Sequence, residues 1–243
     1  GVRATHRAEY RVIASPVGAY FTGGFKPISI WISQTSARAG KNGTGAAKSG
    51  GNYAASLVAQ SEGYDNGCSQ VMFLDAESST YVEELGGMNL FFVFKDGHVA
   101  TPALDGAILS GITRKSLIQL MQDRGIAVQE RKISIEEVRS GITSGLISEV
   151  FACGTAAVIT PVGTVRSADG EFSVSDNVAG PVTKRLRSAL VHVRVHPRPE
   201  TRRVLARVTS AQVHAGTGVR TAESGTVGDA CVTDVQSPEA EER

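Results

Sequence analysis

Residues 43–57 read GTGAAKSGGNYAASL, and this stretch decides how the chain is interpreted. A single lysine, Lys48, stands among glycines and alanines before a helix-like run, so another molecule can approach its amine closely. A lysine confined in a pocket can lose its proton and attack a carbonyl as a Schiff-base nucleophile. The stretch is not a Walker phosphate-binding loop, because that motif needs glycine where Asn42 and Ala47 stand. Taken alone, it would also suit an exposed loop lysine.

Three further blocks follow along the chain and decide between these two interpretations. They are YVEELGGMNLFFV at 81–93, LSGITR at 109–114 and EVFACGTAA at 149–157. With the lysine block, they closely resemble the class IV pyridoxal-phosphate aminotransferases, and most specifically the branched-chain amino acid aminotransferases. The resemblance runs from about residue 1 to about residue 190. Four separated blocks in the same order make it specific, whereas any one of them alone would be weak.

The resemblance implies a mixed α/β (α+β) fold, namely the large C-terminal domain of the class IV pyridoxal-phosphate (D-amino-acid aminotransferase-like) fold, over residues 1–190. The local patterns agree with this class, because strand-like and helix-like segments alternate irregularly. Strands are expected at 9–14, 27–33, 70–75, 88–94, 126–133, 149–153 and 157–161, and helices at 53–63, 113–124, from 134, and 180–190. In the first helix, Asn52 is the expected N-cap, with Ala54, Leu57 and Val58 on one face. Ser134 and Glu137 have the spacing of a capping box.

Residues 191–243 differ from the rest of the chain. Between residues 184 and 220 stand nine Lys or Arg and one acid, and from 221 to 243 six acids and one basic residue. Apolar periodicity is poor, and the segment does not resemble the family's ending. We expect a non-homologous, disordered tail, or a segment read from an unintended frame. An unpatterned basic run of this kind is typical of a solvated tail, so no nucleic-acid partner is expected.

By resemblance, the cofactor is pyridoxal 5′-phosphate, and Lys48 would bind it as a Schiff base and transfer the proton during catalysis. Glu84 would pair with the pyridine nitrogen, and its neighbour Glu83 would point the other way in an extended segment. Tyr53 would hydrogen-bond the phenolic oxygen of the cofactor. Without the resemblance, the two glutamates would suit a surface strand and Tyr53 would suit a packed core.

Phosphate binding is expected where the second helix begins. The first N–H groups of a helix lack partners within it, and its positive dipole end favours an anion. By resemblance, the backbone amides of Ile112 and Thr113 hold the phosphate together with the Thr155 hydroxyl. Ser110 stands where the family usually has proline, so the preceding loop is expected to be less rigid.

Three other positions are expected on the substrate side of the site. By resemblance, Ala156 offers its backbone N–H to the substrate carboxylate, and Tyr20 and Gly87 also lie near the substrate. A tight turn between strands would explain the segment 154–156 equally well.

Composition narrows the remaining function classes. The 243 residues are 41% hydrophobic and 20% charged, which is typical of a soluble globular protein. The formal net charge of +1 lacks the excess of positive charge that is typical of nucleic-acid-binding proteins. No apolar run is long enough for a membrane span, and the N-terminus is no signal peptide. Three sparse cysteines suit a reducing cytoplasm, and no Cys/His cluster has metal-ligand spacing.

The resemblance implies amino transfer between Leu, Ile or Val and 2-oxoglutarate by a full-length homodimeric parent. Two class IV relatives, D-amino-acid transaminase and aminodeoxychorismate lyase, stay open as alternatives. By resemblance, the phosphate-clamping arginine belongs to a small N-terminal domain of the family, which we expect to be missing from this chain. This chain alone is therefore expected to convert Leu and 2-oxoglutarate slowly or not at all. The other alternative is an inactive fragment that at most binds cofactor or a partner chain.

Overall fold

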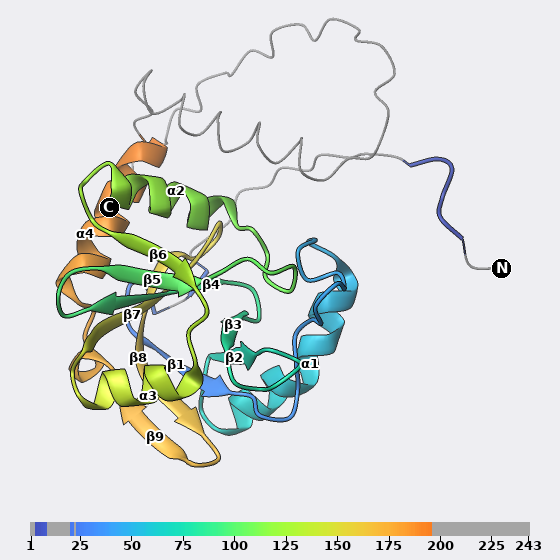
Figure 1. Cartoon of the computed structure of the whole chain (residues 1–243), viewed down its shortest axis with the longest axis horizontal. Helices are drawn as coiled ribbons and strands as arrows, with labels where there is room; N and C mark the ends of the chain where they lie inside the picture. Colours follow the sequence, from blue (N-terminus) through green and yellow to red (C-terminus); the bar gives the residue numbers. More distant parts are fainter. Residues whose placement is uncertain (1–2, 9–19, 22, 196–243) are drawn as a thin grey trace, which may run out of the picture.

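The computed structural model describes residues 3–8, 20–21 and 23–195 (Figure 1). A nine-stranded mixed sheet lies at its centre, so the expected α/β class is confirmed. The strand order is β3-β2-β1-β8-β7-β4-β5-β6, with β9 paired to β8. The strands are β1 Ile28–Ile32, β2 Gln70–Leu74, β3 Val82–Leu85, β4 Asn89–Phe94, β5 Val99–Pro102, β6 Val128–Arg131, β7 Ile147–Gly154, β8 Val158–Ser167 and β9 Gly170–Ser173.

Helices connect two of the three parallel pairs of strands. β1 is parallel to both β2 and β8, β5 is parallel to β6, and the other pairs are antiparallel. A parallel pair needs a crossover, which α1 supplies between β1 and β2 and α2 supplies between β5 and β6. The helices are α1 Gly50–Asp65, α2 Ile112–Gln122, α3 Ile135–Thr143, α4 Pro181–Val195 and the short 3-10 helix η1 Ser175–Asn177.

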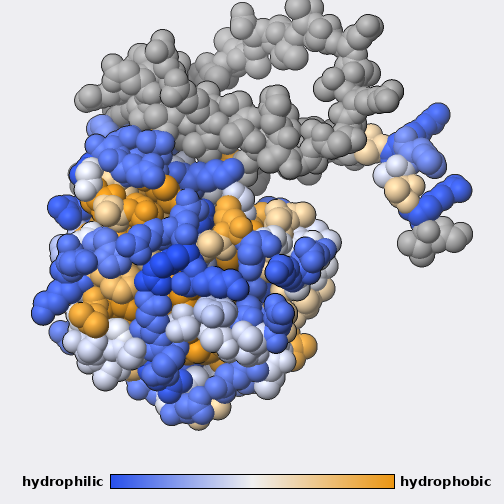
Figure 2. All heavy atoms as spheres, in the orientation of Figure 1, coloured by the Kyte–Doolittle hydropathy of each residue, from blue (hydrophilic) through white to orange (hydrophobic). Residues whose placement is uncertain are grey.

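The central strands are buried on both faces. Successive side chains of a strand point to opposite faces, so Phe92 of β4 packs in the cluster that contains Val138 of α3. Phe91 and Val93 face the other way and pack in the cluster that contains Leu117 of α2 and Leu186 of α4. Figure 1 accordingly shows α2 and α4 on one side of the sheet and α3 on the other. In Figure 2, hydrophilic residues cover the edge of the molecule at α2, and apolar residues are visible just beneath it.

Helix α1 begins earlier than expected, at Gly50, and its N-cap is Ser49. The expectation that Asn52 caps the helix is therefore wrong. Asn52 is buried in the first turn, where its amide donates to the carbonyls of Thr44 (2.7 Å) and Ala47 (2.9 Å). A polar side chain next to a helix start can serve the preceding loop instead of the helix.

The expected apolar face of α1 is also wrong. Leu57 and Val58 are 65% and 76% exposed, and the buried positions are Asn52, Ser56, Ala59 and Gly63. The reason is close packing, because a Cβ added to Gly63 would lie 2.8 Å from Cγ2 of Val71. At Gly63, α1 therefore lies too close to the sheet for a larger residue.

Most of the remaining elements agree with the sequence patterns, but β8 extends to Ser167, past the expected end at 161, and the 3-10 helix η1 was not predicted. The short strands β3, β5 and β9 were not predicted, because four residues are too few to show a period. The Ser134 hydroxyl accepts the Glu137 N–H at 3.0 Å, which confirms one half of the capping box. Helix α4 continues past residue 190 to Val195. The expected strand at 9–14 and most of the expected tail lie outside the described residues.

Among the described residues, no helix combines the length and the apolar character needed to cross a bilayer.

Candidate functional site

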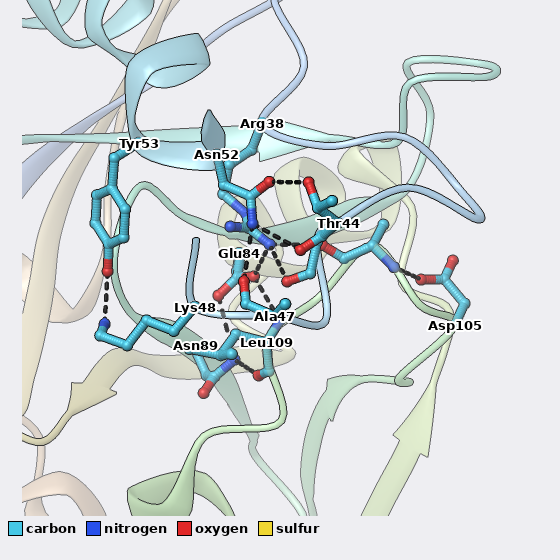
Figure 3. Close-up of polar contacts among 12 residues, drawn as sticks. Arg38, Thr44, Ala47, Lys48, Asn52, Tyr53, Glu84, Asn89, Asp105 and Leu109 are labelled. Carbon is cyan, nitrogen blue, oxygen red and sulfur yellow. Dashed lines mark hydrogen bonds and ion pairs between the residues drawn. The ribbon is translucent and has the colours of Figure 1, made fainter. Parts of the chain in front are cut away.

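Lys48 lies in the loop that joins β1 to α1, next to the first turn of that helix. Its side chain is exposed, and its Nζ donates to the hydroxyl of Tyr53 at 2.6 Å (Figure 3). The same Nζ lies 5.2 Å from the centre of the Tyr53 ring. Tyr53 itself is 41% exposed. The structure thus brings these two predicted residues together at an accessible surface.

The lysine loop is fixed against the segment that precedes α2. A Cβ added to Gly45 would lie 2.1 Å from the carbonyl oxygen of Ala107, so the backbones approach too closely for any other residue. The N–H of Ala46 donates to the carbonyl of Gly106 at 3.0 Å. Together with the two bonds from Asn52, these contacts hold the backbone before Lys48 in one position.

Glu84 lies on β3 and is 2% exposed. Its carboxylate accepts the N–H of Leu109 at 2.8 Å, and Arg38 Nη2 lies 2.6 Å from it (Figure 3). Burial raises the pKa of Glu84 to about 7, against the opposing effects of Arg38, the Leu109 N–H and the nearby charge of Lys48. The segment around Leu109 leads directly into α2, so Glu84 joins the lysine loop to the start of that helix.

Arg38 is a site residue that the sequence reasoning missed. It is 6% exposed, and besides Glu84 its Nη2 reaches the carbonyls of Ala107 (2.6 Å) and Gly45 (3.0 Å). A buried carboxylate needs a cation or several hydrogen-bond donors, and this requirement could have prompted a search for an arginine. No local pattern marks Arg38 as the partner, because the two residues are distant in sequence.

Glu83, the neighbour of Glu84, is also buried, at 4% exposure. One of its carboxylate oxygens has no hydrogen-bond partner, and burial followed by the nearby charge of Asp105 raises its pKa to about 7. The alternative that these glutamates are surface carboxylates is therefore wrong for both. Contacts to Arg38 and to Leu109 distinguish Glu84 from Glu83.

Helix α2 begins after Gly111, where the sequence predicts phosphate binding. Thr113 is 4% exposed, while Ile112 is 39% exposed, and Thr155 is exposed in the turn between β7 and β8. One side chain connects these segments. Arg194 of α4 donates to the Thr113 hydroxyl at 3.1 Å and to the Thr155 carbonyl at 3.2 Å. The sequence reasoning missed this residue, because it treated the arginines after residue 190 as part of a solvated tail.

The predicted substrate-side residues also come close to one another. Tyr20 and Ala156 both line a cavity of about 160 Å³, which Arg187 borders as well. Gly87 lies beside the same turn, since a Cβ added to Gly154 would be 3.6 Å from the Gly87 carbonyl oxygen. The turn at 154–156 therefore lies close to Gly87, and its residue Ala156 shares a cavity with Tyr20.

Within the described part of the chain, no group of three or more His, Cys, Asp or Glu side chains could hold a metal ion. Two cysteines, Cys68 and Cys153, are buried and free.

Comparison with known proteins adds a family match. The sequence profile described as amino-transferase class IV matches residues 6–165. A branched-chain-amino-acid aminotransferase of Mycolicibacterium smegmatis is 55% identical over 196 residues, which are 79% of this chain and 53% of that relative. The chain therefore spans about half the length of the curated relatives it matches.

Solved structures agree with this match. The branched-chain amino acid aminotransferase of Escherichia coli is 40% identical, with a TM-score of 0.62, and the match covers 74% of this chain and 55% of that one. A second branched-chain amino acid aminotransferase, solved as a complex with N-(5′-phosphopyridoxyl)-L-glutamate, is 34% identical with the same TM-score. That match covers 73% of this chain and 55% of the other.

Proposed function

Because the chain belongs to the class IV aminotransferase family, we propose that it is the lysine-bearing part of a branched-chain amino acid aminotransferase. The proposed reaction moves the amino group between Leu, Ile or Val and 2-oxoglutarate. One observation carries the proposal, namely the accessible Lys48–Tyr53 pair within the electrostatic reach of the buried Glu84.

The side chains of the site fit pyridoxal 5′-phosphate. Its aldehyde needs an amine, which Lys48 offers, and its phenolic oxygen needs a donor, which Tyr53 offers. Its ring nitrogen needs a buried carboxylate such as Glu84, and its phosphate needs donors such as those at the start of α2 and on Arg194. The relative that was solved with a phosphopyridoxyl compound supports the same cofactor.

When bound, the cofactor supplies an electron sink for the carbanion that forms at the substrate Cα. The protein must then move one proton, and Lys48 Nζ is the group we assign to it, as both acid and base. The Tyr53 hydroxyl, 2.6 Å from that nitrogen, orients the amine. Glu84 places a carboxylate in a site that excludes water, where a charge–charge interaction is stronger than in solvent. Arg38 holds that carboxylate in one orientation.

On the substrate side, we propose that the backbone N–H of Ala156 donates to the substrate carboxylate, near Tyr20 and Gly87. The cavity that Tyr20 and Ala156 share supports this assignment. We further propose a cytoplasmic homodimer of the full-length parent, with no nucleic-acid or membrane partner. The exposed apolar residues Leu57 and Val58 on α1 offer a surface for a second chain.

The proposal is tested by trapping the cofactor on the protein. The 243-residue chain is mixed with pyridoxal 5′-phosphate and reduced with borohydride, and the labelled peptide is mapped. We expect the label on Lys48, its loss in Lys48→Ala and its retention in Lys41→Ala, a control in the same loop. Label on another lysine would exclude the assignment. Spectral changes on adding leucine, but not D-alanine, would support the branched-chain substrate.

A further inference from the structure

Arg194 lies between the two segments that are assigned to the cofactor phosphate. Its guanidinium donates to the side chain of Thr113 on α2 and to the backbone of Thr155 in the turn between β7 and β8. Both acceptors are uncharged oxygens. Within the described ranges, no carboxylate pairs with Arg194. Desolvation lowers the pKa of its guanidinium, and the thiol of Cys153 acts in the opposite direction. The cation therefore has no anionic partner in the described protein.

Arg194 is exposed, and its guanidinium lies beside the start of α2. The start of α2 carries the positive end of the helix dipole and N–H groups without partners in the helix. A guanidinium next to that end adds a second positive charge to the first. An anion bound between the two would be attracted by both, and a guanidinium forms two parallel hydrogen bonds to phosphate oxygens.

The anchoring of α4 explains why Arg194 arrives at this place. The buried carboxylate of Glu149 on β7 accepts the N–H groups of Val182 (2.9 Å) and Thr183 (2.8 Å), which fixes the first turn of α4. A Cβ added to Gly180 would lie within 2.4 Å of that carboxylate, so the approach is tight. From this anchor, α4 continues for about 20 Å, at the usual helical rise per residue, before it reaches Arg194.

The direction of α4 completes the placement. Residues that follow α2, Arg124 and Ile126, border a shared hollow with Val182 and Arg185 near the start of α4. The end of α4 contacts Thr113 near the start of α2. The two helices therefore run antiparallel, and the last turn of α4 lies at the N-terminus of α2.

We propose that Arg194 is a phosphate-binding residue of this chain and that it clamps the 5′-phosphate of the cofactor between the start of α2 and the turn at Thr155. The proposal rests on the proposed function, since it concerns the same site. A simpler role for Arg194 is stabilisation of α4, because a cation in the last turn of a helix interacts favourably with its dipole.

The experiment compares two aldehydes that differ only by the phosphate, pyridoxal 5′-phosphate and pyridoxal. Their binding to the 243-residue chain is followed by the absorbance of the adduct on Lys48, for the wild type, Arg194→Gln and Arg185→Gln. Arg185 is exposed, and its distance of nine residues places it on the opposite face of α4, so its variant is a matched charge control. Thermal unfolding without ligand checks that each variant folds.

We expect Arg194→Gln to weaken the binding of pyridoxal 5′-phosphate by roughly 10- to 100-fold, the range expected for lost hydrogen bonds to a charged group. The binding of pyridoxal should not change, and Arg185→Gln should affect neither aldehyde. Equal weakening of both aldehydes would assign Arg194 to helix stability and overturn the proposal. Unchanged binding of pyridoxal 5′-phosphate would overturn it as well.

A second measurement separates this inference from the proposed function. If neither aldehyde forms an adduct on Lys48 in the wild type, the proposed function fails. The role of Arg194 is then tested with inorganic phosphate by isothermal titration. Weaker phosphate binding by Arg194→Gln than by the wild type would support an anion site at Arg194, and equal binding would overturn it.

Discussion

Replacing Arg38 by methionine is the most direct perturbation of the carboxylate at the site. Methionine keeps much of the length of the side chain but removes the charge. It would leave Glu84, which is 2% exposed, without the guanidinium that lies 2.6 Å away. It would also remove donors from the carbonyls of Gly45 and Ala107. Removing one partner of a buried ion pair costs about 3–5 kcal/mol, because the remaining charge stays desolvated.

The pH dependence of this loss gives a sharper test than its size. Burial already raises the pKa of Glu84 from 4.5 to about 7, and the charge of Arg38 opposes that rise. Without Arg38 the pKa of Glu84 should rise further. A carboxyl group whose pKa is raised by folding binds its proton more tightly in the folded state. Its contribution to stability is therefore lost as pH rises from the unfolded pKa through the folded one. At about pH 5, Glu84 is protonated in both proteins and the charge-related loss should be small, whereas at about pH 8.5 it should be largest.

Urea unfolding at both pH values, for Arg38→Met, Glu84→Gln and the double variant, measures this coupling. At the higher pH we expect the double variant to be more stable than Arg38→Met alone, because glutamine leaves no buried charge behind. The same loss at both pH values, together with additive effects in the double variant, would refute the idea that Arg38 acts by neutralising Glu84.

Three further predictions concern other residues at or near the site. In the full-length parent, Glu84→Gln should reduce turnover by roughly 100-fold and Glu83→Gln far less, and equal effects in a kinetic assay would exclude the assigned pairing. Glu83→Gln should also raise the unfolding free energy near pH 8 by about 1 kcal/mol, since it removes a buried, partly unsatisfied charge. Gly45→Ala should lower the free energy of unfolding by about 1–3 kcal/mol, because its Cβ would collide with the carbonyl of Ala107. Gly40→Ala, whose Cβ would meet no atom within 4 Å, should leave the free energy of unfolding nearly unchanged, and urea unfolding measures both variants.

The features that the sequence predicted well are those encoded within a few residues. Lys48 and Tyr53 are five positions apart in one block, and the structure places them in contact. The strands β4 and β7 were also predicted, and the structure buries both faces of each. Helix α2 was predicted over 113–124 from its amphipathic pattern, within two residues of its observed bounds.

The features that the sequence did not predict depend on distant contacts. The buried face of α1 was assigned to Leu57 and Val58, since a large apolar residue normally points inward. The structure reverses this because Ala59 and Gly63 allow the helix to approach the sheet closely, and no local pattern encodes that distance. The partner of Glu84 was missed for a similar reason, since Arg38 is distant in sequence and meets Glu84 where the lysine loop contacts the segment before α2.

The site residues that the sequence predicted and those that it missed differ in their chemical role. The groups assigned to bond formation and proton transfer lie in compact sequence blocks, and for that reason a resemblance could identify them. The two arginines assigned to charge balance, Arg38 and Arg194, come from a loop and from the end of a helix, and each meets its target through tertiary packing. A cation can act from any segment that brings it within hydrogen-bonding distance, because its effect depends on charge and distance and not on a fixed backbone geometry. Charge balance at such a site can therefore be supplied by different segments in different chains, while the lysine block must keep its local spacing.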